Sequence, residues 1–189
     1  VTLEEDEIWY GDYYLIGGAL DLNGHTLTIN GNLIQAAGTV TIGGGTLVVE
    51  GDYRIQMQDV VDNTVVYGMS SGVLQMTQPS DHLVVKGNFV TDSSIRQEGC
   101  LTDGIMEIQG DMQVNATYSN CNFVASDKHM LLLSGTKRQQ ISFEKSGSKY
   151  SRIANLEITN TSEEGTVFVE KPYIYGHVKD NDNLITGYI

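Results

Sequence analysis

Two pairs of acidic residues have a spacing that could place two carboxylates side by side. Glycoside hydrolysis needs two carboxyl groups about 5 to 9.5 Å apart, one on each side of the bond that breaks. Asp59 with Asp62, or Asp180 with Asp182, could supply such a pair. Neither pair stands in a recognisable catalytic context, and acidic pairs are common in the loops of a chain with a net charge of −13. We therefore expect no catalytic residues, and a polysaccharide-active enzyme, a lyase or a glycoside hydrolase, is the alternative.

Aromatic side chains gather near both ends of the chain, where they could bind sugar rings or cap the core. They are Trp9, Tyr10, Tyr13, Tyr14, Tyr173, Tyr175 and Tyr188. Alternation along a strand directs Trp9 and Tyr13 inward. The same alternation directs their neighbours Tyr10 and Tyr14 outward. The candidate ligand-binding residues are Tyr10, Tyr14, Tyr173 and Tyr175.

The charge balance limits the partners of this protein. The chain has 11 basic and 24 acidic residues, a balance that repels nucleic acids and anionic lipid surfaces. No apolar stretch approaches the roughly 18 to 20 residues that span a bilayer. We expect a glycan or protein ligand, no nucleic acid and no membrane insertion. Five basic residues could form an anion-binding face or a solvated rim: Lys137, Arg138, Lys145, Lys149 and Arg152.

Metal and disulfide chemistry is limited to two features. The segment Asp180-Asn-Asp-Asn183 offers oxygen ligands of the kind that Ca²⁺ prefers, but it lacks the glycine and distal glutamate of an EF-hand loop. We expect no other cofactor. Cys100 and Cys121 are 21 residues apart, and on neighbouring coils of a solenoid they would lie about 5 Å apart, within the range of a disulfide. Two free thiols are the alternative.

An internal repeat must position these residues. A glycine followed by Asn or Asp recurs at Gly11-Asp12, Gly31-Asn32, Gly51-Asp52, Gly87-Asn88 and Gly110-Asp111, with a degenerate copy at Gly135-Thr136. Apolar side chains lie two and four residues before the later glycines, and a large apolar side chain follows two residues after all but the last, where Lys137 stands. Each unit is therefore a short strand, a bend and a second strand. We expect the bend to need a positive φ, which Gly and Asn or Asp tolerate.

Stacked units of this kind predict an all-β right-handed parallel β-helix, a β-solenoid with coils of about 20–25 residues and one domain over residues 1–189. The core should then hold one column made of Leu27, Leu47, Leu83 and Met106. An antiparallel β-sandwich would explain the strands but not the constant offset from glycine. The long interval between the third and fourth glycines predicts an extra partial coil, and residues 115–122 predict a protruding loop.

Two segments resemble coils of secreted or surface-exposed bacterial β-solenoid proteins: residues 18–33, GALDLNGHTLTINGNL, and residues 45–56, GTLVVEGDYRIQ. Residues 131–143 and 155–160 look like repeat material of the same proteins. The resemblance implies an extracellular or cell-surface location. Such proteins include adhesins, stalks and polysaccharide-degrading enzymes, and the fold alone does not choose among them.

We expect a non-catalytic module for surface display or adhesion, which binds glycan or protein or serves as a rigid stalk. Because the chain begins with Val rather than Met, we also expect a fragment of a larger surface or secreted protein. Exposed end coils predict end-to-end self-association.

Overall fold

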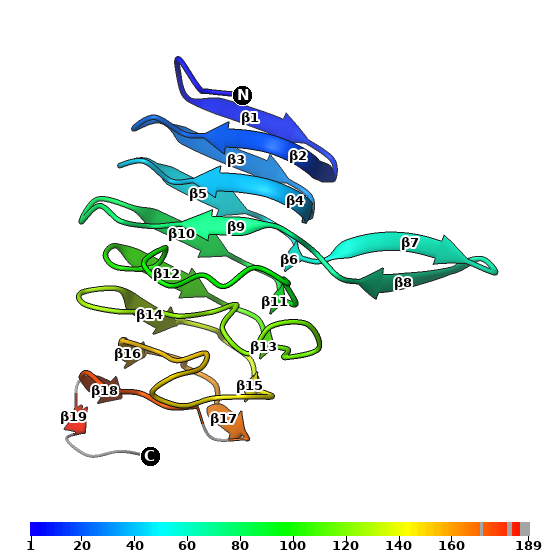
Figure 1. Ribbon diagram of the computed structural model, residues 1–189. Helices are drawn as coiled ribbons and strands as arrows, with labels where there is room; N and C mark the ends of the chain where they lie inside the picture. Colours follow the sequence, from blue (N-terminus) through cyan, green and yellow to red (C-terminus); the bar gives the residue numbers. More distant parts are fainter. Residues whose placement is uncertain (171, 181–182, 186–189) are drawn as a thin grey trace.

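The computed structural model describes residues 1–170, 172–180 and 183–185. Every regular element among them is a β-strand, and the strands stack as a β-solenoid of about eight turns (Figure 1). The predicted fold class is therefore confirmed. The antiparallel sandwich is wrong, because strands of successive coils pair in parallel.

The first sheet forms one long wall of the stack. Its strands, in spatial order, are β1 (Glu7–Tyr10), β3 (Thr26–Asn30), β5 (Thr46–Val49), β10 (His82–Val85), β12 (Ile105–Ile108), β14 (Met130–Leu133), β16 (Asn155–Ile158), β18 (Val178–Asp180) and β19 (Asn183–Ile185). All neighbours are parallel except β18 and β19, which pair antiparallel. Among the described residues, this antiparallel pair is the last in the sheet.

The second sheet forms the facing wall. Its strands, in spatial order, are β17 (Thr166–Val169), β15 (Gln139–Phe143), β13 (Met112–Val114), β11 (Phe89–Thr91), β6 (Tyr53–Ile55), β4 (Leu33–Thr41) and β2 (Tyr13–Asp21), and β9 (Val73–Gln75) pairs with the far end of β4. The pairing of β9 with β4 begins a third side of the stack. Isolated parallel bridges, such as Met76–Leu101 and Ile153–Ile174, continue this side along the later coils.

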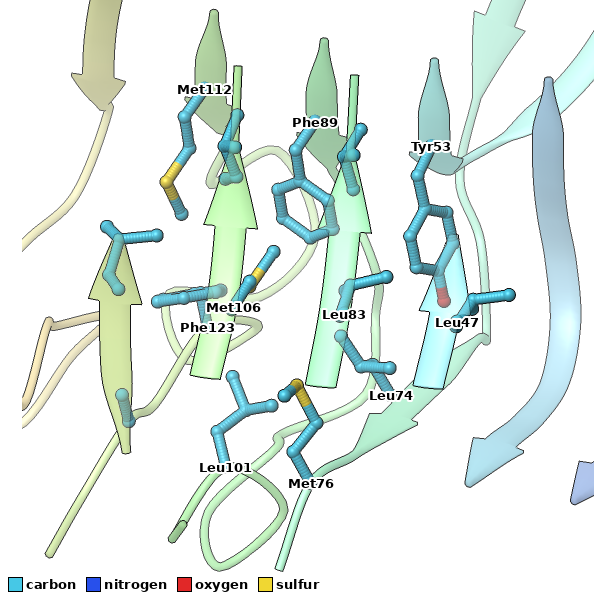
Figure 2. Packing of buried hydrophobic residues seen from close by; sticks show 14 of the residues in the cluster. Leu47, Tyr53, Leu74, Met76, Leu83, Phe89, Leu101, Met106, Met112 and Phe123 are labelled. Carbon is cyan, nitrogen blue, oxygen red and sulfur yellow. The ribbon is translucent and has the colours of Figure 1, made fainter. Parts of the chain in front are cut away.

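Apolar side chains of the same offset lie in one column inside these walls. Leu27 is in register with Leu47, Leu47 with Leu83, and Leu83 with Met106. All four are fully buried. In Figure 2, Leu47, Leu83 and Met106 lie on one wall, facing Tyr53, Phe89 and Met112 on the other. The predicted column is confirmed, because period-two alternation makes each strand bury every second side chain.

Aromatic rings fill the middle of the core. Tyr53 and Phe89 meet edge to face with ring centroids 5.5 Å apart, and Phe123 continues the series 6.1 Å from Phe89. The buried Tyr53 hydroxyl donates to the side-chain oxygen of Gln35 over 2.6 Å. Burial raises the pKa of Tyr53 well above its ordinary value, so this hydroxyl keeps its proton.

The Gly-Asx corner, the bend between the first and second sheets, explains the repeat motif. The prediction of a positive φ at this bend is wrong for every copy after the first, because among the glycines and Asx residues of the motif only Gly11 has a positive φ. A Cβ on Gly87 would instead lie 2.6 Å from the carbonyl carbon of Gly51. Glycine is required because the backbone of the preceding coil passes too closely for any side chain.

The Asx residue of the motif joins one coil to the next. The Asn32 side-chain oxygen accepts from the Asp52 N–H over 2.8 Å, and the Asp52 carboxylate accepts from the Asn88 N–H over 2.8 Å. Asn88 accepts from the Asp111 N–H over 2.9 Å, and Asp111 accepts from the Gln140 N–H over 2.8 Å. A ladder of side-chain oxygens therefore runs along the corner and satisfies backbone donors that the bends leave outside the sheets.

A β-hairpin projects sideways from the stack, made of β7 (Met57–Val61) and β8 (Thr64–Gly68) (Figure 1). The expected extra partial coil is therefore wrong: β5 pairs directly with β10, so the long interval belongs to one turn. Asp62 and Asn63 both have positive φ, 50° and 60°, which suits a tight two-residue turn. Two valine runs flanking Asp-Asn were the sequence signal for this hairpin.

Candidate functional site

A recess of about 240 Å³ lies at the C-terminal end of the stack, lined by Ser148, Arg152, Tyr173 and Tyr175. Ile153 and Ile174 pair in a parallel bridge, and this pairing brings the flanking residues of two successive coils together. The sequence placed Tyr173 and Tyr175 among the ligand-binding candidates and Arg152 among the basic residues. The structure joins these two predictions in one place.

Hydrogen bonds hold the walls of the recess. Arg152 donates through Nε to the Ala125 carbonyl over 3.2 Å and through Nη1 to the Ser148 carbonyl over 2.9 Å. Its guanidinium carbon lies 5.9 Å from the centre of the Tyr175 ring. The Tyr175 hydroxyl accepts a hydrogen bond from the Asp127 N–H. The arginine and the ring are therefore positioned before any ligand arrives.

Tyr175 keeps an accessible surface beside this arginine, since 40% of the residue is exposed. Tyr173 is half-buried, and its backbone N–H donates to the Ser146 hydroxyl over 2.7 Å. An aromatic surface next to a cation and a serine offers a sugar both an apolar contact for its C–H groups and hydrogen-bond partners for its hydroxyls. Arg152 and Ser148 could have been found in the sequence, because Arg152 precedes Tyr175 by 23 residues, about one coil.

Tyr10 and Tyr14 lie at the other end of the stack, in the first coil. Both side chains point outward as expected, with 82% of Tyr10 and 47% of Tyr14 exposed. Trp9 and Tyr13 pack against the core, with ring centroids 4.4 Å apart. The four candidate tyrosines therefore form two separate pairs, and the C-terminal pair borders the recess described above.

The candidate carboxylates that the structure describes lie on the projecting hairpin and in the last parallel strand of the first sheet. Asp59 and Asp62 are both on the projecting hairpin, where the Asp59 carboxylate accepts from the Val60 N–H over 2.7 Å. Asp180 belongs to β18, but Asp182 and much of the predicted Ca²⁺ segment lie outside the described residues. Within residues 1–170, 172–180 and 183–185, no group of three His, Cys, Asp or Glu side chains could hold a metal ion.

The structure places four of the five predicted basic residues against different neighbours. Lys145 lies over the Tyr150 ring, 4.9 Å from its centre, and Arg152 belongs to the recess. Lys137 and Arg138 line a different cleft, at the Gly-Asx corner. The sequence grouped these side chains by their proximity along the chain, whereas the coils separate them.

Cys100 and Cys121 are free thiols in the structure. The Cys121 thiol donates to the Lys149 carbonyl over 3.4 Å. Burial raises the pKa of both thiols, which lowers the fraction of reactive thiolate at neutral pH. A disulfide between them stays a prediction for an oxidising environment.

Comparisons with family models, with curated proteins and with solved structures found no match to this chain. In the part of the chain that the structure describes, no helix has the length and apolar character of a membrane span.

Proposed function

We propose that this protein is a non-catalytic display module of a secreted or cell-surface protein, and that it binds glycan in the recess at the C-terminal end of the solenoid. The observation that carries the proposal is the convergence of Tyr173, Tyr175 and Arg152 around a recess of about 240 Å³. Its size suits one sugar unit rather than a long chain, so the ligand would be a terminal residue or a branch.

The architecture supports a display role through its stiffness. Each coil is fastened to the next by parallel strand pairing on two walls and by the Asx ladder along one corner. Because every coil is held by its neighbours, such a stack is stiff and can present a binding site at its end. The extracellular location is proposed from the resemblance of residues 18–33 and 45–56 to coils of bacterial surface solenoids.

A glycan array followed by calorimetric titration tests the proposal. The protein should bind at least one glycan, and Tyr175→Ala should weaken that binding at least about tenfold because the stacking surface is lost. Tyr175→Phe keeps the ring and should bind within about threefold of the parent protein. Tyr10→Ala removes an exposed tyrosine at the opposite end of the stack and is the matched control.

Three results would contradict the proposal. The array could show no binding, Tyr10→Ala could weaken binding as much as Tyr175→Ala, or the bound glycan could be cleaved. Release of new reducing ends or unsaturated products during the titration would favour the polysaccharide-active alternative.

A further inference from the structure

A second cleft, of about 470 Å³, lies along the Gly-Asx corner and is separate from the glycan recess. It crosses three successive coils at their bends and is lined by Lys86, Gly87, Asn88, Gln109, Gly110, Asp111, Thr136, Lys137 and Arg138. Its volume lies within the range of small-molecule sites, roughly 300 to 1,000 Å³. A bare inorganic ion would fill only a small part of it.

One of the bends that line this cleft is longer than the bends before it. Three residues separate β12 from β13, whereas five residues, Ser134 to Arg138, separate β14 from β15. This longer bend contributes Thr136, Lys137 and Arg138 to the cleft, beside the tight glycine bends at Gly87 and Gly110. This is the degenerate copy of the repeat, at which Lys137 replaces the expected apolar residue.

A buried amide pair holds the longer bend in place. The Gln139 side chain is fully buried, and its Nε2 donates to the carbonyls of Ile108 and Gly110 over 2.9 and 2.8 Å. Its Oε1 accepts from the Gly135 N–H and from Asn160 Nδ2, which also donates to the Lys137 carbonyl over 2.8 Å. The backbone that carries Lys137 and Arg138 is therefore anchored to the core and positions both cations at the cleft.

The charge of this cleft is opposite to that of the molecule. Three of the 11 basic residues line it, Lys86, Lys137 and Arg138, against one carboxylate, Asp111. Lys86 is paired with Glu50 over 2.7 Å, and Asp111 is engaged by the Gln140 N–H. Within the described part of the chain, Lys137 and Arg138 have no ion-pair partner. A protein with a net charge of −13 thus keeps two cations free beside a concave, polar surface.

We propose that this cleft binds an oxyanion group, a carboxylate, sulfate or phosphate, carried on a molecule of sugar size. Lys137 and Arg138 would contact the anion, with Arg138 able to donate two parallel hydrogen bonds to its oxygens. Asn88 and Gln109 would form hydrogen bonds with the hydroxyl groups on the rest of the ligand. The site does not depend on the glycan recess, because the two share no residue.

Titrations monitored by the backbone amide signals of Gly87 and Gly110 test this site. The probes are a galacturonate trisaccharide, a sulfated disaccharide and glucose 6-phosphate, with glucose as the neutral control, so that the three sources of the anion are distinguished. At least one anionic probe should shift these signals where glucose does not. Its affinity should fall as salt is raised, because the contacts are charged.

Matched double variants decide whether the cleft or the overall charge is responsible. Lys137→Gln with Arg138→Gln should weaken the best anionic probe at least about tenfold. Lys145→Gln with Lys149→Gln changes the net charge equally outside the cleft and should change affinity less than about twofold. Tyr175→Ala should leave this binding unchanged, so failure of the glycan recess would not be mistaken for failure of the cleft.

Each remaining result would overturn the proposal. These results are the absence of shifts with all three anions, equal shifts with glucose, and equal weakening by the two double variants.

Discussion

The Gly-Asx corner and the β7–β8 hairpin both reverse the chain within a few residues, yet different neighbours determine their shapes. At the corner, a Cβ on Gly87 would meet the Gly51 carbonyl carbon at 2.6 Å, whereas a Cβ on Gly68 in the hairpin would meet only the end of Met57 at 3.7 Å. The corner is constrained by the coil stacked against it. The hairpin is shaped by its own backbone, through the positive φ of Asp62 and Asn63.

The two regions also differ in how far their apolar side chains are exposed to solvent. Inside the stack, Leu47 and Phe89 are fully buried. On the hairpin, Val60 is 60% exposed and its cross-strand partner Val65 is 48% exposed. A lone hairpin gains little from such side chains. Stability in this protein therefore comes from the stacking of the coils, and the hairpin contributes little to it.

Alanine substitutions at Gly87 and Gly68 test this difference most strongly. We expect Gly87→Ala to lower the free energy of unfolding by about 3 kcal/mol or more, because backbone must move to admit the methyl group. Gly68→Ala should change it by less than about 0.5 kcal/mol, since the methyl group would make only an ordinary contact with the end of Met57 and φ is not positive there. Urea denaturation of both variants measures the difference. Similar losses at the two sites would mean that close stacking does not set the constraint.

The protonation of the buried His129 depends on how well the stacked coils exclude water from the core. Burial lowers the pKa of this side chain to about 4, and neither ring nitrogen has a hydrogen-bond partner in the described structure. In the unfolded chain the His129 side chain becomes protonated near pH 6.5, whereas in the folded chain it becomes protonated only near pH 4. The contribution of neutral His129 is therefore complete above about pH 6.5, and about 3 kcal/mol is lost as the pH falls to about 4.

The variant His129→Leu isolates this effect. Its unfolding free energy, measured by urea denaturation from pH 7 to pH 4, should fall less steeply than that of the parent protein. His177→Leu, at an exposed position, is the control and should keep the parent slope. An unchanged slope in His129→Leu would show that the interior admits the charged imidazole.

Removing the hairpin should have a smaller effect than either Gly87→Ala or protonation of His129. Replacing residues 57–68 with a short Gly-Ser linker removes the contact of Arg54 with the Tyr67 ring, 4.4 Å to its centre, and the hydrogen bond of Gln58 with Tyr14. Both are near the surface, so we expect a loss of less than about 1 kcal/mol. Circular dichroism and urea denaturation would check it. Loss of the folded stack would show that the hairpin organises the coils.

The regular coils were predictable from the sequence, and the departures from regularity were not. The column of Leu27, Leu47, Leu83 and Met106 follows from their constant offsets from glycine. The hairpin was mistaken for a partial coil because valine runs fit either structure. The role of Gly87 was misjudged because sequence reasoning considered its own φ, whereas the constraint comes from Gly51, 36 residues earlier.

The candidate site was predictable only in part. Tyr173 and Tyr175 were proposed from residue type and their place near the chain end, and the outward direction of Tyr10 and Tyr14 came from alternation. The pairing of Tyr175 with Arg152 was not foreseen, although their separation of 23 residues was a signal for it. The coils differ in length, so this signal becomes a contact only through the way that the two coils stack.

The sequence by itself determined the stacking, the inward side chains and the excess of negative charge, because these properties are local or repeat along the chain. The tertiary structure decided where the chain leaves the repeat and what meets there: the recess beside Arg152, the cleft with Lys137 and Arg138, and the glycine that the neighbouring coil demands. These features arise between coils of different length, so their geometry depends on contacts across the stack rather than on any one segment.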